Sequence, residues 1–180
     1  MAKRSAGLLA YRRREDRLEV LLVHPGGPYW RDKEDGAWSI PKGEHALDED
    51  AFAAACREFR EETSWPLPVT ADPANPTAGP GGVGQAAARE PEDAFIPVGE
   101  ATLSSGKVVR AWAFEGDFNP ATLRSNTFTF EWPRGSGRIH EYPEVDRAGW
   151  FSLEEARLKM HPAQVVFLER LKQHLETRKR

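Results

Sequence analysis

Short apolar runs, separated by polar, glycine-rich or proline-rich breaks, form the N-terminal part of the chain. Residues 5–11 and 18–24 are apolar and flank a charged turn, which predicts a β-hairpin. Residues 25–28, Pro-Gly-Gly-Pro, break the chain after it. A polar loop follows, and residues 37–40 predict a short strand that ends at residues 41–43, Pro-Lys-Gly.

Helical periodicity replaces this pattern from about Asp50 to Glu62. Apolar side chains recur there at positions i, i+3, i+4 and i+7, the spacing of one helix face. Pro66 and Pro68 prevent the helix from continuing. The predicted buried stripe consists of Phe52, Ala55, Cys56 and Phe59.

Strand-like sequence returns in the second half of the chain. Residues 95–103 and 107–115 predict a second hairpin. Residues 117–138 predict irregular structure that ends in a loop over 132–138. A last strand is predicted over residues 146–151.

The C-terminal segment predicts two helices. Ser152 and Glu155 have the spacing of a capping box, which predicts the start of a short helix. Pro162 is expected in the first turn of a final helix. Because strands and helices interleave, the predicted fold class is α/β with a mixed sheet. The final helix is predicted to bury Val165, Val166, Leu168, Leu171 and Leu175.

Residues 72–91 are of low complexity, since 13 of these 20 residues are Gly, Pro or Ala. Few of the side chains could anchor the segment in a core. We therefore expect a flexible surface insertion at about 70–92, within a single domain that spans residues 1–180.

Composition narrows the class of protein. A chain of 180 residues is typical of one domain. Its 25 basic and 28 acidic residues give a net charge of −3, so neither DNA nor a membrane is an expected partner. The single cysteine, Cys56, excludes an internal disulfide and a cysteine zinc cluster. These features predict a cytoplasmic globular protein.

Three acidic residues share one face of the predicted helix. Glu58, Glu61 and Glu62 are spaced i, i+3 and i+4, so their like charges repel each other. A divalent cation would offset this repulsion, and clustered carboxylate oxygens suit Mg²⁺ or Mn²⁺. Taken alone, the spacing is also typical of an acidic helix face in water.

The residues around these acids follow a longer pattern. Gly43 is followed after five residues by Glu49, and after seven more by Arg57–Trp65, Arg-Glu-Phe-Arg-Glu-Glu-Thr-Ser-Trp. This resembles the Nudix box of the Nudix (MutT-type) hydrolases, G-x5-E-x7-R-E-U-x-E-E-x-G-U, where U is a bulky apolar residue. Ser64 stands where the box has glycine. A left-handed residue often ends a helix, so serine there is expected to lower stability by about 1 kcal/mol.

The resemblance implies an α/β/α sandwich with a mixed sheet and a metal-dependent hydrolase of nucleoside diphosphate linkages, with Mg²⁺ (or Mn²⁺) as cofactor. It implies that Glu58, Glu61 and Glu62 bind the metal together with the carbonyl of Gly43, that Arg57 orients a carboxylate, and that Glu49 supports the site. The general base varies in the family. Glu58 is the first candidate here, and Glu141 and Glu144 are candidates on a later loop.

Other side chains are candidates for substrate contacts. Lys42, and less strongly Arg31, could contact phosphate. Trp30 and Trp132 could stack on a base, with Trp132 favoured because it lies in a loop with two arginines, whereas Trp38 is expected in the core. The five histidines lack ligand spacing and are interpreted as non-catalytic: His24, His45, His140, His161 and His174.

The predicted function is a pyrophosphohydrolase that cleaves a nucleoside triphosphate or a dinucleoside polyphosphate. The segment 38–44, Trp-Ser-Ile-Pro-Lys-Gly-Glu, is similar to the W-x-x-P-K-G lead-in of Nudix enzymes that act on polyphosphate chains. Two alternatives stay open: a nucleotide-sensing module without turnover, and a hydrolase of RNA 5′ ends. The second is disfavoured because no basic stripe is evident in the sequence. The oligomeric state stays open.

Overall fold

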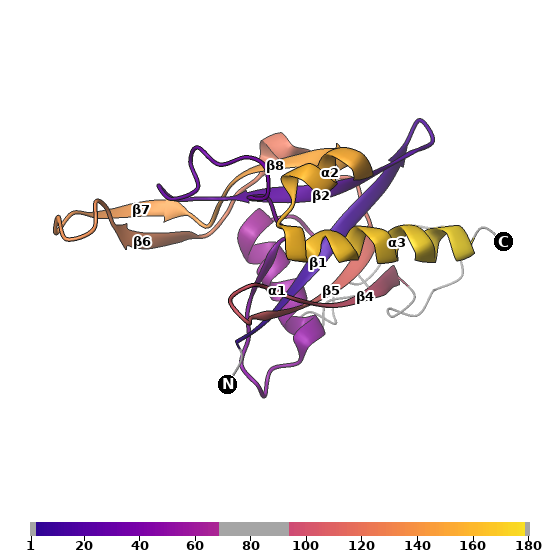
Figure 1. Ribbon diagram of the computed structural model, residues 1–180, viewed down its shortest axis with the longest axis horizontal. Coiled ribbons are helices and arrows are strands. Elements are labelled where there is room, and N and C mark those ends of the chain that lie inside the picture. The colour runs from indigo at the N-terminus through magenta and orange to yellow at the C-terminus, as the bar shows by residue number, and fades with distance from the viewer. Residues whose placement is uncertain (1–2, 69–93, 179–180) are drawn as a thin grey trace, which may run out of the picture.

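A six-stranded mixed sheet forms the centre of the fold (Figure 1). The computed structural model describes residues 3–68 and 94–178. The strand order is β4-β5-β1-β2-β8, with β3 added on β1, and β1 pairs in parallel with β5 but antiparallel with β2 and β3. The strands of this sheet are β1 (Arg4–Arg14), β2 (Arg17–Pro25), β3 (Lys42–Glu44), β4 (Phe95–Thr102), β5 (Val108–Glu115) and β8 (Val145–Ser152).

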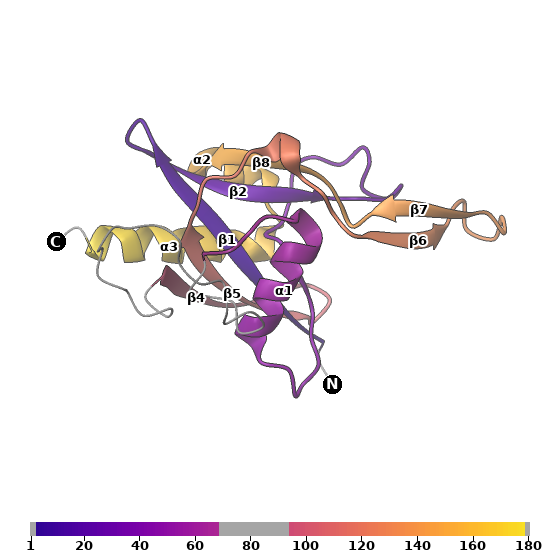
Figure 2. The ribbon, with the colours of Figure 1, turned by 180° about the vertical axis from the view of Figure 1, so that it is seen from behind.

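Helices cover both faces of the sheet. Helix α1 (Ala51–Thr63) lies on one face, while α2 (Leu153–Lys159) and α3 (Val165–Thr177) lie on the other, as Figures 1 and 2 show from opposite sides. Within the described residues, no helix is long and apolar enough to cross a membrane. The arrangement is the expected α/β/α sandwich with a mixed sheet.

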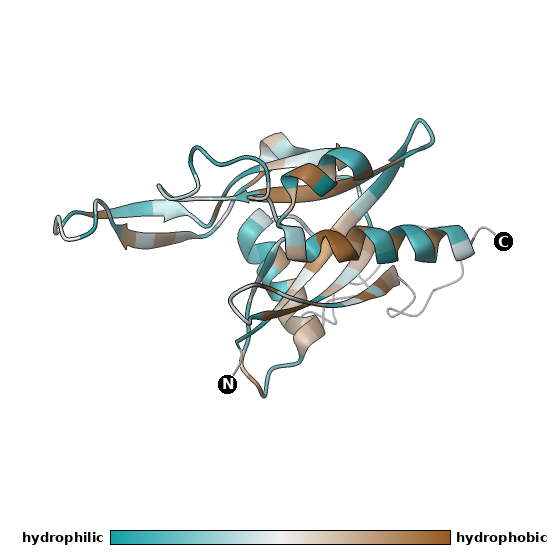
Figure 3. Cartoon of the chain, in the orientation of Figure 1, coloured by the Kyte–Doolittle hydropathy of each residue, from teal (hydrophilic) through white to brown (hydrophobic). Residues whose placement is uncertain are grey.

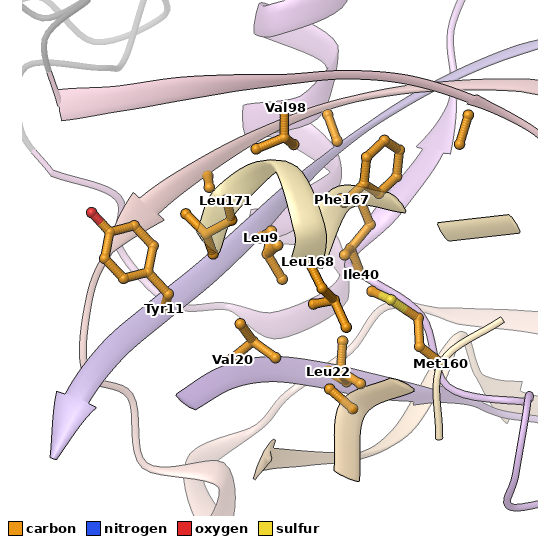
Figure 4. Close-up of a cluster of buried hydrophobic side chains, with 14 of the residues drawn as sticks. Leu9, Tyr11, Val20, Leu22, Ile40, Val98, Met160, Phe167, Leu168 and Leu171 are labelled. Atoms are coloured by element: carbon orange, nitrogen blue, oxygen red, sulfur yellow. The ribbon is translucent and has the colours of Figure 1, made fainter. Parts of the chain in front are cut away.

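Successive side chains of β1 point to opposite faces of the sheet, so this strand contributes to the core on both sides. Leu8 is fully buried in the cluster beneath α1, whereas the adjacent Leu9 is fully buried in the cluster beneath α3. Successive strand residues point to opposite faces, so a strand between two helical layers is apolar throughout. The α3 side of this core contains Leu9, Val20, Leu22, Ile40, Phe167 and Leu168 (Figure 4). Hydrophobic and hydrophilic residues alternate along α3 (Figure 3), as expected of a helix with one buried face.

Most predicted elements are confirmed. Both hairpins, the helix from Asp50, the strand near 146–151 and the capping box are present, with Ser152 and Glu155 exchanging both expected hydrogen bonds. Pro162 lies in a 3₁₀ turn, Pro162–Gln164, immediately before α3. Of the five side chains predicted for the face of α3, Leu168, Leu171 and Leu175 are buried, while Val165 and Val166 are partly buried.

Two predictions of local structure are wrong. Residues 37–40 form isolated bridges to Val23 and Met160, and the strand is instead Lys42–Glu44, because the chain passes Pro41 before it pairs with β1. Residues 117–138 are not irregular throughout, since β6 (Thr127–Glu131) pairs with β7 (Ile139–Pro143) in a separate hairpin. The predicted insertion at about 70–92 lies outside the described residues.

The C-terminus of α1 has the left-handed residue that the sequence predicts. Ser64 has φ 59° and ψ 17°, and its N–H donates to the carbonyl of Arg60 at 2.8 Å. Its hydroxyl also donates to the carbonyl of Arg124 at 2.8 Å. The serine therefore combines backbone strain with a hydrogen bond that a glycine could not make.

Two substitutions at this position separate the two effects. Ser64→Ala removes only the hydrogen bond, while Ser64→Gly also removes the strain of a Cβ at positive φ, worth about 1 kcal/mol. We expect Ser64→Gly to unfold roughly 2–4 °C above Ser64→Ala in thermal melts. Turnover should be the same in wild type and both variants, since Ser64 lies beyond the acidic residues. Equal melting temperatures for the two variants would contradict the assignment of strain.

Candidate active site

The end of α1 presents acidic side chains along the border of its buried face. Cys56 and Phe59 are fully buried against the sheet. Glu58 is 8% exposed, and Glu61 and Glu62 are partly exposed. The periodicity of 3.6 residues per turn places the three carboxylates next to the apolar stripe rather than opposite to it.

These carboxylates line a pocket of about 480 Å³. Its walls come from the end of β2, the loop after it, β3, the last turns of α1, β6 and the residue between β7 and β8. The lining residues are Pro25, Gly26, Trp30, Lys42, Gly43, Glu44, Glu58, Glu61, Glu62, Phe128 and Glu144.

Arg57 connects the acids of the pocket to Glu49. Its guanidinium binds both oxygens of Glu49, at 3.1 and 3.3 Å, and donates to Glu58 at 2.7 Å and to Glu61 at 3.2 Å. The hydrogen bonds with Glu49 raise the pKa of Arg57 further above its ordinary value, so the guanidinium stays charged. Arg57 and Glu49 thus orient two of the acidic side chains.

Glu62 is held by the backbone of β3. The N–H of Lys42 donates to a Glu62 carboxylate oxygen at 3.0 Å. Burial raises the pKa of Glu62 to about 8, against the opposing charge of Lys42. Burial lowers the pKa of the Lys42 ammonium, which the charge of Glu62 partly restores. A cation in the pocket would stabilise the ionised form of this carboxylate.

Gly43 is required by space rather than by its backbone angles. A Cβ at this position would overlap the carboxylate of Glu58. The backbone of β3 and the Glu58 carboxylate therefore approach more closely than any side-chain-bearing residue would permit.

Of the two later-loop acids, the structure brings only Glu144 to the pocket. Its N–H donates to the carbonyl of Asn126 at 2.8 Å, and its carbonyl accepts from Gly26 at 2.9 Å, which fixes the residue between β7 and β8. Burial, and secondly the charge of Glu61, raise the pKa of Glu144. Glu141 is exposed and accepts a hydrogen bond from Thr127 at 2.7 Å, away from the pocket lining.

The aromatic side chains of the pocket differ from those favoured by the sequence. Trp30 and Phe128 line it, whereas Trp132 is 39% exposed on the β6–β7 hairpin and Arg31 is exposed in the loop after β2. Trp38 is buried, as expected. The alternating sequence Thr-Phe-Thr-Phe-Glu at 127–131 was the available signal for Phe128, because period-2 alternation predicts a strand with one apolar face.

None of the five histidines, all within the described residues, lines this pocket. His24 nevertheless has a structural role that sequence reasoning missed. It is fully buried, with Nδ1 2.7 Å from Asp146 and Nε2 2.7 Å from the carbonyl of Lys33. These contacts tie the loop that carries Trp30 to strands β2 and β8.

The donor chemistry of the pocket fits a hard divalent cation. Glu58, Glu61, Glu62 and Glu144 supply oxygen atoms only, which suits Mg²⁺ or Mn²⁺. In residues 3–68 and 94–178, no three Asp, Glu, His or Cys side chains are already arranged as a ligand set. The carboxylates instead engage Arg57 and the Lys42 N–H. Their side chains would have to rotate away from these partners to converge on one ion.

Comparisons with solved structures agree with this architecture. The chain is similar to C. elegans Ap4A hydrolase in a binary complex, with 20% identity, coverage of 98% of this chain and 99% of that chain, and a TM-score of 0.58. It is also similar to the NUDIX domain of Shewanella oneidensis NrtR complexed with ADP ribose (12% identity, coverage 97% and 89%, TM-score 0.57). A MutT/nudix family protein from Listeria innocua gives 19% identity, coverage of 98% and 95%, and a TM-score of 0.55.

At these identities the structural likeness establishes the fold alone. No curated protein sequence matches the chain. The family model of the NUDIX domain, however, matches residues 1–171, nearly the full length and including the whole acidic box. The chain therefore belongs to the Nudix family of hydrolases.

Proposed function

We propose that this protein is a metal-dependent pyrophosphohydrolase that cleaves a diphosphate linkage in a nucleotide. The observation that carries the proposal is the gathering of Glu58, Glu61, Glu62 and Glu144 around one pocket with Lys42 at its edge. Carboxylates alone would repel a polyphosphate, so the pocket requires a cation between protein and substrate. Mg²⁺ is the leading candidate and Mn²⁺ the second, since both prefer oxygen ligands.

Each residue of the pocket has a distinct part in this proposal. Glu58, Glu61 and Glu62 hold the cation, which when bound neutralises phosphate charge and lowers the pKa of a coordinated water. Arg57, fixed by Glu49, keeps Glu58 and Glu61 oriented. The ammonium of Lys42 contacts a phosphate oxygen, as a cation in a partly dehydrated position does.

Two carboxylates are placed to accept the proton of the attacking water. Glu58 stays the first candidate, although Arg57 already donates to it at 2.7 Å. Glu144 is the second, because it lines the same pocket, from the segment between β7 and β8. Glu141 lies outside the pocket and is not proposed for this role.

The substrate is proposed to be a nucleoside triphosphate or a dinucleoside polyphosphate. Trp30 and Phe128 supply aromatic surface at the pocket, and a nucleobase stacks on such surfaces. The similarity to a structure of Ap4A hydrolase and to a NUDIX domain complexed with ADP ribose is in keeping with this class of ligand.

A substrate panel tests the proposal. Nucleoside triphosphates, dinucleoside polyphosphates, ADP-ribose and an inositol pyrophosphate would each be incubated with the protein and Mg²⁺ or Mn²⁺, with phosphorus NMR identifying the bond cleaved. We expect turnover of at least one nucleotide and none when a chelator removes the metal. Turnover that persists in chelator would contradict the metal dependence. Thermal stabilisation by a nucleotide without any turnover would instead indicate the sensing module.

A further inference from the structure

The β6–β7 hairpin projects from the body of the molecule as an arm (Figures 1 and 2). It forms its own two-stranded sheet, separate from the six-stranded sheet. An isolated two-stranded hairpin is marginally stable in water. Because the arm packs into no larger sheet within the described residues, the side chains on its two faces are candidates for a binding role.

One face of the arm is aromatic. In the antiparallel register Phe128 lies opposite Tyr142 and Phe130 opposite His140. Phe130 is stacked on Trp132, with ring centroids 6.4 Å apart and an interplanar angle of 28°. The backbone N–H of Trp132 donates to the carbonyl of Arg138 at 3.0 Å, which extends the pairing of the two chain segments beyond the ends of β6 and β7. We define the aromatic face as Phe128, Phe130, Trp132, His140 and Tyr142.

The acids of the arm lie on its opposite face. Alternation places Glu131 and Glu141 there, since they occupy the odd positions of β6 and β7. Their hydrogen bonds agree with this: Glu141 accepts from the hydroxyl of Thr127 at 2.7 Å, and Glu131 from the N–H of Gly137 at 2.7 Å. By this register, the aromatic face contains no carboxylate.

The aromatic face begins at the acidic pocket. Phe128, its first ring, lines that pocket together with Glu144. The base of the arm is tied to the end of α1, because the N–H of Asn126 donates to the carbonyl of Glu61 at 2.8 Å and its carbonyl accepts from Glu144 at 2.8 Å. The arm thus has a fixed starting point relative to the carboxylates, and its rings lead away from them.

We propose that the aromatic face binds the unpaired bases of a single-stranded oligonucleotide whose 5′ phosphates occupy the acidic pocket. Every base has a π-face, so consecutive rings beside cationic groups bind single strands without a deep cleft. Phe128 and Phe130 of β6 and Trp132 just after it follow one another with centroid spacings of 6.5 and 6.4 Å, more aromatic surface than a single base covers. This inference rests on the proposed function in one respect, namely that the pocket binds phosphates.

The segregation of charge favours a nucleic acid over an apolar partner. A net charge of −3 for the whole chain conceals this local face, which is why the sequence alone disfavoured an RNA ligand. A strand of phosphates needs only local cations near its path, and Arg138 is such a cation at the tip of the arm, where its backbone carbonyl pairs with Trp132.

Binding of non-hydrolysable analogues in the presence of Mg²⁺ tests the proposal without any hydrolysis and keeps the cation that the pocket requires. Adenylates of one, two and four nucleotides, each with a methylene-bridged 5′ triphosphate, would be titrated by calorimetry into wild type, Trp132→Ala and Phe130→Ala. Ile139→Ala is the matched control, because this side chain is 65% exposed on the opposite face of the same arm. A tetra-adenylate with a 5′ hydroxyl measures the arm without phosphates in the pocket.

We expect the tetranucleotide to bind wild type at least about tenfold more tightly than the mononucleotide. Each aromatic substitution should weaken tetranucleotide binding about tenfold, consistent with stacking on one ring. Mononucleotide binding should change less than about twofold, and Ile139→Ala should resemble wild type. If no substrate of the panel is hydrolysed but binding still increases with oligonucleotide length, the proposed function is refuted and the role of the arm is retained.

Three results would overturn the inference. Affinity that does not depend on length would remove any role for further bases. An equal loss of dinucleoside tetraphosphate and tetranucleotide binding in Trp132→Ala would assign the face to the second base of a small molecule. A dimer in sedimentation that Trp132→Ala dissociates, without change in oligonucleotide binding, would assign it to a second copy of this chain.

Discussion

Glu62→Gln is expected to reduce nucleotide turnover by about 10³-fold. The substitution keeps the acceptor for the Lys42 N–H but removes a negative charge that the proposed cation requires. Loss of a metal ligand removes several kcal/mol of transition-state stabilisation, and each ~1.4 kcal/mol is a factor of ten in rate. The decrease should appear in kcat with Mg²⁺ or Mn²⁺. Glu141→Gln, which replaces an acid outside the pocket, is the matched control and should turn over at the wild-type rate.

The same variant has an opposite effect on the stability of the metal-free protein. Burial raises the pKa of Glu62 to about 8 in the folded state, above its ordinary value of 4.5. A group with a raised folded pKa contributes its full stability below the unfolded pKa and loses it as the pH rises through the folded pKa. In chelator, we therefore expect Glu62→Gln to melt above wild type at pH 8–9 and to match it near pH 4.5. Mg²⁺ should stabilise wild type and not the variant.

A melting temperature for Glu62→Gln below that of wild type at pH 8–9 would show that burial of the ionised Glu62 carboxylate does not destabilise the metal-free protein. Retained turnover in this variant would exclude Glu62 as a metal ligand. Since the two readouts move in opposite directions, an unfolded variant cannot be mistaken for a chemically inactive one.

The helix that carries the acids could be predicted from sequence because its signals are local. Asp50 accepts from the N–H of Ala53 at 2.8 Å as the cap that starts α1, and the apolar stripe decides which side is buried. Once that side is fixed, the 3.6-residue period places Glu58, Glu61 and Glu62 at its border. The left-handed Ser64 follows in the same way from the end of the helix.

The other wall of the pocket could not be predicted, because it depends on long-range pairing. Glu141 and Glu144 have similar sequence surroundings, and only the register of β6 with β7 decides which of them turns inward. A shift of one residue in a strand exchanges its two faces. The sequence favoured Trp132 over Trp30 for a related reason, since the closeness of the loop at Gly27 to the ring of Phe128 joins distant parts of the chain.

Gly43→Ala is expected to reduce turnover by about 10²-fold while the protein still folds. The new Cβ would overlap the Glu58 carboxylate, which is the end of a flexible side chain and can move aside. The substitution is therefore expected to displace Glu58 and to disrupt its hydrogen bond from Arg57, which is 2.7 Å long in the wild type, without disturbing the core. A misplacement of about 1 Å in a catalytic group is enough for a loss of this size.

A double-mutant cycle with Glu58→Ala tests the cause. If the methyl group acts by displacing the carboxylate, Gly43→Ala should change neither turnover nor melting temperature further once Glu58 is alanine, so the two effects should be strongly non-additive. Additive losses would show that Gly43→Ala acts elsewhere, for example on the pairing of β3 with β1. The cycle thereby tests whether Gly43 is needed to leave room for the Glu58 carboxylate, as the close packing of the β3 backbone against that carboxylate indicates.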